Sequence, residues 1–248
     1  MASFGPIAPF YDQLMSSVPY DMWVSYYELL LLQQEVKPRR LLDVCCGTGV
    51  VTQMLAEKGY AMAGVDLSAP MIQVAKQKCA DAGLNIRYEA MDAAEFDLGM
   101  KFHAAYSFFD SFNYITDLGH LRKAFHRVAA HLMPGGSFVF DVNTDYAFEA
   151  EMFNQSDTRK KSAVKYDWKG EYDAGTRIIR VNMDFWVDGQ PYQEVHIQRA
   201  HRHEELIELL RDAGFEDLMA YDSYTLDRPR KRSDRIHYTA RKPGTLSP

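Results

Sequence analysis

Apolar and polar positions along the chain alternate between two periods, one typical of strands and one typical of helices. Short apolar runs indicate five buried strands, at 40–45, 60–66, 85–90, 102–109 and 135–143. Apolar residues at helical spacing predict helices between these runs, over 50–59, 70–83 and 118–132. Strands and helices that alternate with short connections are typical of a parallel sheet with helices on both faces.

Two further segments frame this pattern. The aromatic and leucine-rich run at 20–36 predicts an N-terminal helix, and 204–215 predicts a helix that Gly214 ends. Two last strands are expected around 218–224 and 235–240, which brings the sheet to seven strands. Glycine, proline and serine mark several of the boundaries, including a turn at 134–136 before the fifth strand.

The alternation of strand and helix breaks between about 145 and 200. Residues there alternate as in half-buried strands, and Asp188 and Gly189 separate two such runs in the manner of a hairpin turn. We therefore expect an α/β doubly wound, mostly parallel sheet that carries an antiparallel β insertion. We expect a single domain over 1–248 that consists of a helical lid at 1–36, a core at 37–144, the insertion at 145–201 and the completion of the core at 202–248.

Composition narrows the class of protein. The chain has 248 residues, 47% of them hydrophobic, with a net charge of −6, which disfavours nucleic acid as a partner. No apolar stretch approaches the roughly 20 residues of a membrane helix, and the N-terminus lacks the pattern of a signal peptide. We expect a cytoplasmic protein without a membrane partner, and a homodimer is compatible with the sequence.

Cysteine usage points away from disulfides and metal. Cys45, Cys46 and Cys79 are odd in number, and neighbouring cysteines rarely pair with each other. A zinc site would need further soft ligands at spacings such as CxxC, so we expect no metal.

The stretch RRLLDVCCGTG at 39–49 leads an apolar strand into a glycine turn. The turn could simply connect strand to helix, or it could let a ligand approach bare backbone. Asp66 and Asp92 follow the next two strands, and the carboxyl ends of parallel strands meet at one edge of a sheet, where ligands bind. A nucleoside crossing these strand ends would meet the glycine turn, an acid for its ribose and a further polar group, so we favour the ligand site.

Two common nucleotide motifs do not fit this turn. A dinucleotide fold favours GxGxxG, but Thr52 stands where the third glycine belongs. The phosphate loop GxxxxGK[ST] is absent from the sequence as well.

The ordered segments LLDVCCGTG, GVDLSAPMI, MDAAEF, SFFDSFNYI and LMPGGSFVFDV resemble the motif series of class I S-adenosylmethionine-dependent methyltransferases. The match spans nearly the whole chain. The segments FYDQLMSSVPYDMW and EVHIQRAH further resemble small bacterial members related to those that methylate amino sugars and glycine. The resemblance implies S-adenosylmethionine as cofactor, with S-adenosylhomocysteine as its product.

The resemblance also implies roles for individual residues. The turn from Cys45 to Gly49 would contact the methionine part of the cofactor, with Asp43 supporting the turn or the ammonium group. Asp66 would bind the ribose diol, and Asp92 would accept from the adenine amine. The remaining positions implied as cofactor-binding are Tyr11, Trp23, Gly47, Thr48, Leu67, Met71, Ala93, Ser107 and Phe108. The family usually has glycine or alanine where Cys45 stands, so we expect a tight but functional turn.

Other interpretations stay open for several of these residues. Tyr11 and Trp23 would belong to the lid, yet aromatic residues at helical spacing are as often core. Polar residues that follow the fourth and fifth strands could face the methyl group or could cap neighbouring helices: Asp110, Ser111, Asn113, Tyr114, Asp141 and Asn143. The basic run at 228–235 could be a solvated loop or could hold a phosphate.

One strand of the insertion carries the candidate base. Glu194, His196 and Gln198 share one face of that strand. If this face covers the pocket, His196 is a candidate general base, with Asn113 as a second candidate catalytic residue; if it faces water, all three are solvated. His201 and His203 are expected to be structural.

Three functions are compatible with the sequence. The favoured one is methyl transfer to a small-molecule acceptor by direct alignment, with nitrogen favoured over oxygen as the nucleophile. The others are a protein that binds S-adenosylmethionine or S-adenosylhomocysteine without catalysis, and a methyltransferase for RNA or protein. The acidic composition weakens the last of these.

Overall fold

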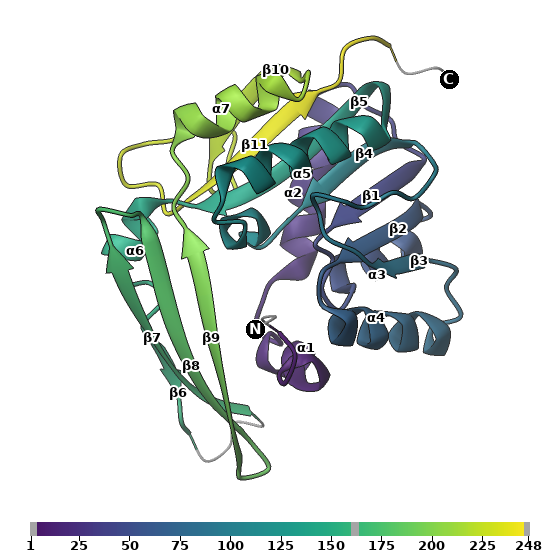
Figure 1. Cartoon of the computed structure of the whole chain (residues 1–248). Coiled ribbons are helices and arrows are strands. Elements are labelled where there is room, and N and C mark those ends of the chain that lie inside the picture. Colours follow the sequence, from purple (N-terminus) through teal and green to yellow (C-terminus); the bar gives the residue numbers. More distant parts are fainter. Residues whose placement is uncertain (1–3, 160–163, 246–248) are drawn as a thin grey trace.

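The computed structural model describes residues 4–159 and 164–245, and a sheet of seven strands lies at its centre (Figure 1). The strand order is β10-β11-β5-β4-β1-β2-β3. β11 runs antiparallel to both of its neighbours, and the other pairs are parallel. The strands are β1 (Arg40–Val44), β2 (Ala61–Asp66), β3 (Arg87–Ala90), β4 (Phe102–Ser107), β5 (Leu132–Asn143), β10 (Glu216–Asp222) and β11 (Arg235–Arg241). The predicted fold class is confirmed.

Helices cover both faces of this sheet (Figure 1). The larger of them are α2 (Tyr20–Gln33), α3 (Val50–Glu57), α4 (Ala69–Asp81), α5 (Leu118–His131) and α7 (His203–Asp212). Apolar residues of α5 and α7 pack on one face, around Phe125, Leu206 and Phe138. Those of α2 and α3 pack on the other, around Tyr27 and Leu55. Because both faces of the central strands are buried, the sequences of these strands are continuous apolar runs and do not alternate between apolar and polar residues.

Most predicted elements are present with ends that differ by a few residues, as fraying helix ends would lead one to expect. The turn predicted at 134–136 is wrong, because β5 already begins at Leu132. Phe102 pairs with Leu132 and Ala104 with Ser137, so β5 holds three extra residues at this point. Gly135, with φ of 74°, lies within this irregularity of the pairing.

The insertion forms a second, antiparallel sheet in the order β6-β7-β8-β9. Its long strands extend away from the central sheet (Figure 1). Asp188 and Gly189 form the predicted two-residue turn with φ of 50° and 81°, which is the left-handed pair that hairpins favour. The strands are β6 (Gln155–Asp157), β7 (Val164–Asp173), β8 (Ile178–Val187) and β9 (Gln190–Arg199).

Short elements connect the two sheets to the N-terminus and to the core. The sequence pattern did not predict them, because a single turn contains too few residues to display a period. They are the 3₁₀ helices η1 (Ala8–Phe10) and η2 (Ser111–Tyr114) and the helices α1 (Tyr11–Leu14) and α6 (Asp145–Glu149). Within the described ranges, no helix has the length and apolar character needed to cross a membrane.

Strand order reverses at β1, which has β2 and β3 on one side and β4 and β5 on the other. The carboxyl ends of these five strands lie along one edge of the sheet. A reversal of this kind opens a crevice at that edge, and ligands bind there in doubly wound folds. The inserted sheet and the N-terminal helices lie next to this edge (Figure 1).

Candidate functional site

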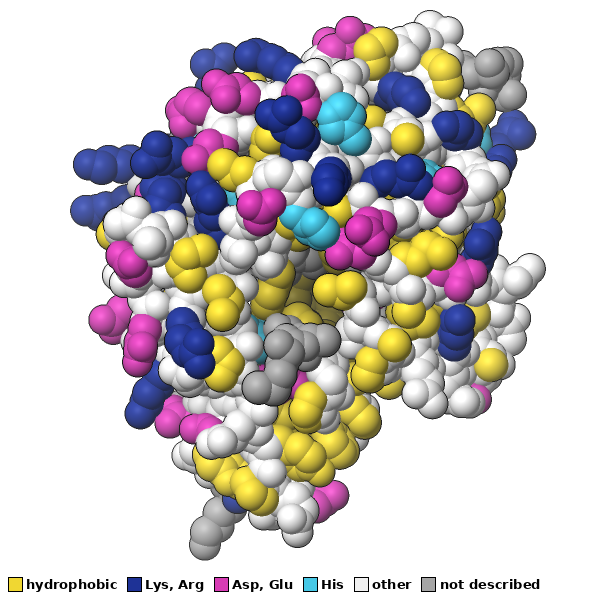
Figure 2. Space-filling model, in the orientation of Figure 1, with side chains coloured by type: hydrophobic (Ala, Val, Ile, Leu, Met, Phe, Trp, Pro, Cys, Tyr) yellow, Lys and Arg dark blue, Asp and Glu magenta, His cyan; other side chains and the backbone are white. Residues whose placement is uncertain are grey.

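A cavity of about 790 Å³ lies at the carboxyl ends of the central strands. Figure 2 shows hydrophobic side chains gathered around a hollow in the middle of one face of the molecule. The cavity brings together most of the residues that the sequence singled out. Those that line it are Tyr11, Trp23, Asp43, Cys45, Gly47, Thr48, Asp66, Leu67, Met71, Asp92, Ala93, Phe108 and His196.

Three predicted residues are not part of this lining. Ser107 and Asn113 are fully buried. The side chain of Asn113 donates to the carbonyl oxygens of Asn143 and Arg199 at 2.9 and 2.8 Å, and it accepts from the amide of Asn143 at 3.0 Å. This placement favours a structural role for Asn113, because its side chain ties η2 to the ends of β5 and β9. The third residue is Gly49, the N-cap of helix α3.

The glycine turn owes its shape to left-handed backbone. Cys45, Gly47 and Gly49 have φ of 65°, 54° and 75°. For a residue with a Cβ this region costs on the order of 1 kcal/mol, so Cys45 is a strained position in a turn that otherwise uses glycine. The amide of Cys46 donates to the carbonyl of Val65, which fastens the turn to β2. The expected tight turn is therefore present, with the strain at Cys45.

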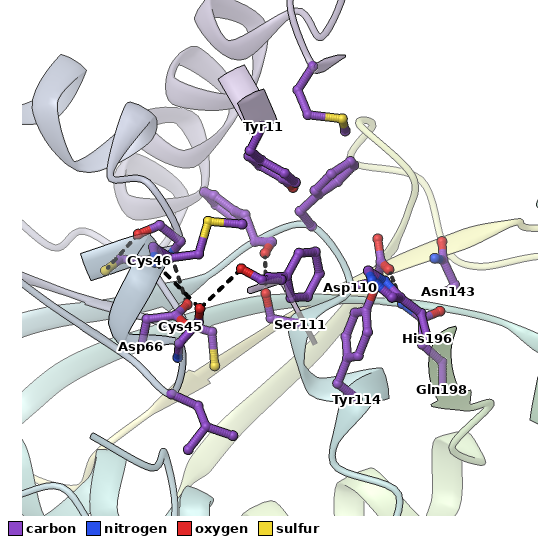
Figure 3. Close-up of a pocket in the computed structure, with 18 of the residues that line it drawn as sticks. Tyr11, Cys45, Cys46, Asp66, Asp110, Ser111, Tyr114, Asn143, His196 and Gln198 are labelled. Atoms are coloured by element: carbon purple, nitrogen blue, oxygen red, sulfur yellow. Dashed lines mark hydrogen bonds between the residues drawn. The ribbon is translucent and has the colours of Figure 1, made fainter. Parts of the chain in front are cut away.

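Asp66 is held by backbone amides on both of its oxygens. Gly47 donates to Oδ2 and Ser68 donates to Oδ1, each at 2.8 Å. Burial raises the pKa of Asp66, and these two hydrogen bonds offset part of that rise. Because both bonds come from the backbone, they fix the direction of the carboxylate, and the residue lines the cavity beside the turn (Figure 3).

Asp92 follows β3 and is oriented in a similar way. It accepts from the amide of Ala94 at 2.8 Å, and Nε2 of His120 lies 2.9 and 3.0 Å from its two oxygens. His120 also lines the cavity. This position was not predicted, because the sequence pattern of α5 shows only its apolar face. Leu67 lies at the rim and is 66% exposed, whereas Met71 is buried.

Asp43 lies beneath the turn and is almost inaccessible to water. Its Oδ2 accepts from Thr52 of α3 at 2.5 Å and from Tyr106 of β4 at 2.8 Å. Burial raises the pKa of Asp43 to about 7, although the two hydroxyl donors favour the ionised form. A carboxyl of this kind is half protonated near neutral pH, so a cation placed beside it would favour ionisation.

The N-terminal segment is docked on the turn through α1. Asp12 accepts from the hydroxyl of Thr48 and from the ammonium group of Lys78, both at 2.5 Å. Tyr11 lines the cavity from this segment. Trp23 belongs to the core cluster of α2 and α3 and also lines the cavity, with its ring centroid 5.1 Å from that of Phe109. The two interpretations of Trp23, core and cavity wall, therefore both apply.

On the other side of the cavity, three side chains form a hydrogen-bonded chain. The hydroxyl of Tyr114 lies 2.8 Å from Nδ1 of His196, and Nε2 of His196 lies 2.8 Å from Oε2 of Glu194. The amides of Phe4 and Ile7 donate to the Glu194 carboxylate at 2.9 and 3.1 Å. This face of β9 is buried and covered by the N-terminal segment, so the solvated interpretation does not hold.

The partners of His196 define its protons. A carboxylate can only accept a hydrogen bond, so Nε2 carries the proton and Nδ1 accepts from Tyr114. Burial alone would raise the pKa of Glu194, but the hydrogen bonds from His196, Phe4 and Ile7 bring it below its ordinary range. Burial, together with the nearby Asp110, raises the pKa of Tyr114, which therefore remains a donor.

Arg235 joins the strand ends on this side. It contacts Oδ1 of Asp110 at 2.8 Å and also pairs with Asp141. Nε2 of Gln198 donates to the other oxygen of Asp110 at 2.6 Å. Asp110 and Phe109 both have left-handed backbone, with φ of 49° and 66°. Arg235 is the last residue of the basic run at 228–235. Because it pairs with two acids, its side chain is directed inward and is not a solvated part of that run.

The cavity therefore has two ends (Figure 3). Cys45, Cys46 and Asp66 lie at one end, beside the glycine turn, whereas Asp110, Tyr114, Asn143, His196 and Gln198 lie together at the other. The three cysteines are free thiols. Burial raises the pKa of Cys45 and Cys46, which disfavours a thiolate nucleophile.

Comparison with known proteins identifies the family. Residues 41–136 match a family described as "Methyltransferase domain". YqeM of Bacillus subtilis (strain 168), whose name is "Putative methyltransferase YqeM", is 31% identical over 246 residues, covering 96% of this chain and 97% of its own. The chain belongs to the class I S-adenosylmethionine-dependent methyltransferases.

Two other similar proteins support the assignment of the chain to this family. A crystal structure of an S-adenosylmethionine-dependent methyltransferase from Clostridium acetobutylicum ATCC 824 superposes with a TM-score of 0.85 at 28% identity, covering 98% of this chain and 100% of that one. A dTDP-3-amino-3,6-dideoxy-alpha-D-glucopyranose N,N-dimethyltransferase of Streptomyces fradiae is 32% identical over 139 residues, covering 55% of this chain and 53% of its own.

S-adenosylmethionine is the cofactor of this methyltransferase, and the cavity suits it. A Cβ built on Gly47 would meet none of the described atoms within 4 Å, so bare backbone faces open space there. Asp43, which is buried, and Asp66 and Asp92, which are partly buried, line this cavity. Their carboxyl oxygens are acceptors of the kind that ribose hydroxyls and an ammonium group require.

The two glycines of the turn provide a matched pair of variants. Gly47→Ala adds a methyl group to open space at a residue that lines the cavity, so we expect at least a tenfold loss of affinity for S-adenosylhomocysteine and a loss of stability of about 1 kcal/mol. Gly49→Ala would place Cβ 2.4 Å from the hydroxyl oxygen of Tyr88, so we expect stability to fall by about 2 to 5 kcal/mol. Calorimetry and urea unfolding measure the two effects. Unchanged affinity in Gly47→Ala would contradict the approach of the cofactor to this turn.

Asp43 gives the methyltransferase a pH-dependent stability. Because its pKa is about 7 in the folded protein and lower in the unfolded chain, folding binds a proton between these values. The stabilisation is complete below the unfolded pKa and is lost as the pH rises through 7, by up to about 4 kcal/mol. Urea unfolding at pH 5 and pH 8 should show the greater part of this loss, about 2 to 3 kcal/mol, in the native protein and not in Asp43→Asn. Equal pH dependence of the two proteins would contradict it.

Proposed function

We propose that this methyltransferase transfers a methyl group to a small-molecule acceptor, with nitrogen favoured over oxygen as the nucleophile. The observation that carries the proposal is the chain Tyr114, His196 and Glu194, which reaches the same cavity as the glycine turn. Methyl transfer to a protonated nucleophile requires a proton acceptor on one side of the cavity and a cofactor site on the other.

In this proposal the residues at the first end of the cavity hold the cofactor. Asp66 binds the ribose diol, Asp92 and Ala93 bind the adenine, and Asp43 supports the turn or the ammonium group. The remaining wall of this end consists of Tyr11, Trp23, Cys45, Thr48, Leu67, Met71 and Phe108. When bound, S-adenosylmethionine supplies an electrophilic methyl group, so the protein has no need to activate the donor.

At the second end, the residues orient the acceptor and receive its proton. The hydroxyl oxygen of Tyr114 accepts the proton from the acceptor, while its own proton moves to Nδ1 of His196. The imidazolium that forms is stabilised by the carboxylate of Glu194, which already accepts a hydrogen bond from Nε2 of His196. The walls of the cavity keep the acceptor aligned and exclude water.

Nitrogen is favoured because of what such a chain can do. An amine that arrives as an ammonium group has to lose one proton before its lone pair can attack the methyl group. An imidazole that is hydrogen-bonded to a buried carboxylate can receive that proton. An alcohol has a far higher pKa and would need a stronger base. The relative from Streptomyces fradiae, named as an N,N-dimethyltransferase of an amino sugar, supports the same preference.

Turnover tests the proposal directly. The protein is incubated with pooled metabolites and S-adenosylmethionine that carries a labelled methyl group, and products are identified by mass spectrometry. We expect label on the nitrogen of a small molecule, and none when Tyr114→Phe and His196→Ala are combined. Binding of S-adenosylmethionine with no labelled product from any pool would support a non-catalytic binding protein instead.

A further inference from the structure

The end of the cavity that faces the inserted sheet has apolar walls. Val181 and Met183 of β8 line it, together with Trp168 of β7. Trp168 pairs with Met183 across the two strands, so their side chains share one face of the sheet. Met152 and Phe153, between α6 and β6, complete the wall. We call this part of the cavity the apolar chamber, defined by these five residues.

A glycine allows this wall to be closely packed. Gly170 lies two residues after Trp168 on the same face of β7. A Cβ at Gly170 would lie 2.9 Å from Cδ1 of Ile179 and 3.1 Å from Cβ of Phe153. Phe153 therefore rests directly on the strand, and the chamber has a firm apolar surface.

Two residues of the cavity lining, Gln198 and Trp168, each carry a buried polar atom that has no partner among the described residues. Gln198 is 1% exposed, and its Nε2 faces the carboxylate of Asp110, which can only accept, so the position of its Oε1 is fixed. Within residues 4–159 and 164–245, neither Oε1 of Gln198 nor Nε1 of Trp168 has a hydrogen-bond partner. Buried polar groups without partners cost about 1 to 3 kcal/mol each, so a molecule that supplies partners gains affinity here.

The two atoms are complementary in kind and come from different strands. Oε1 of Gln198 accepts and lies beside Asp110 and Tyr114, where the nucleophile is expected. Nε1 of Trp168 donates and lies on β7, with β8 between it and the strand of Gln198. Between them the walls are apolar. An occupant that satisfies Gln198 and packs against these walls has a donor at one end and an apolar body beyond it, and an acceptor on that body would satisfy Trp168 as well.

From these contacts we infer the chemical class of the acceptor: an aryl-alkyl amine, with its amine directed at Gln198 and its flat apolar body in the apolar chamber. The inference rests on the proposed function. A sugar would place several hydroxyl groups against Val181, Met183 and Phe153, where they would lose water without gaining partners. An aromatic body loses little on leaving water and can pack against Trp168.

Two amines of contrasting bodies test the inference. Calorimetry is carried out on the full chain saturated with S-adenosylhomocysteine, with 1-naphthylmethylamine and with glucosamine. We expect the naphthyl amine to bind at least tenfold more tightly than glucosamine. Tighter binding of glucosamine, or binding of neither amine, would overturn the inference.

Two tryptophans of the inserted sheet provide the matched variants. Trp168→Ala should weaken binding of 1-naphthylmethylamine at least tenfold. Trp186→Ala should leave it unchanged, because Trp186 pairs with Lys165 and Pro191 on the opposite face of the sheet. Equal losses in the two variants would overturn the role of the chamber. If a thermal melt shows that Trp168→Ala does not fold, Trp168→Phe and the comparison of amines in the native protein decide instead.

The outcome is separable from that of the proposed function. If labelled methyl is transferred to a polyhydroxylated amine while 1-naphthylmethylamine fails to bind, the acceptor class is wrong and the methyltransferase activity stands. If the naphthyl amine binds but no pooled metabolite is ever methylated, the proposed function is wrong and the chamber remains a binding site for aromatic amines.

Discussion

Replacing Asp66 by alanine is expected to weaken binding of S-adenosylmethionine at least about 100-fold. Two hydrogen bonds from ribose hydroxyls to this partly buried carboxylate contribute about 1.5 to 3 kcal/mol each, and their loss together accounts for an effect of this size. The variant also frees the amides of Gly47 and Ser68, which Asp66 now holds at 2.8 Å. The affinity is measured by calorimetry with S-adenosylmethionine and with S-adenosylhomocysteine.

The control for this variant is Glu89→Ala. Glu89 is an acid on the neighbouring strand β3 that pairs with Arg87 and is not part of the cavity lining. Its removal should leave the affinity unchanged. Unfolding in urea must accompany both measurements, since a collapsed turn would lower stability as well as affinity. If the Asp66→Ala protein binds the cofactor as tightly as the native protein does, Asp66 does not bind the ribose.

Replacing His196 by alanine is expected to lower kcat by about 100-fold or more, with little change in affinity for the cofactor. General bases contribute about 10² to 10⁴ in rate, and His196 connects Tyr114 to Glu194 through hydrogen bonds of 2.8 Å. Glu194→Gln should lower kcat less, because the histidine remains but its imidazolium loses a charged partner. Steady-state kinetics with the acceptor found by labelling measures both effects.

His203→Asn is the matched control for His196. His203 begins α7 and its Nδ1 lies 3.0 Å from the hydroxyl of Tyr238, outside the cavity lining. The control should retain full activity. Full activity in His196→Ala would exclude it as the proton acceptor, whereas equal losses in kcat and in cofactor affinity would indicate that His196 only supports the fold.

The fold was predictable because each level of the sequence agreed with the next. Apolar runs such as 40–45, turn glycines and the Asp188–Gly189 hairpin all act through local backbone preferences that a single sequence displays. The cavity side of the glycine turn was predictable for the same reason, since parallel strands deliver their carboxyl ends to one edge. The irregular start of β5 was not predictable, because it depends on pairing with β4.

The acceptor side of the cavity was harder to predict, because it depends on contacts between β9 and segments that are distant in sequence. Alternation established that Glu194, His196 and Gln198 share a face, but it carries no information about what covers that face. The cover comes from Phe4 and Ile7, nearly 190 residues away in sequence. The inward direction of Arg235 was hidden in the same way. Its partners are Asp110, just before η2, and Asp141 on β5, and a basic run alone does not indicate such distant partners.

A crystal structure of the protein with S-adenosylhomocysteine would show directly where the cofactor lies. We predict adenosine along the carboxyl ends of β1, β2 and β3, with its ribose hydroxyls on Asp66 and its amino-acid end over Gly47. The sulfur would then face Tyr114 across the cavity. A nucleoside bound elsewhere on the surface, or in this cavity with its ribose away from Asp66, would show that this edge of the sheet is not the cofactor site as assigned.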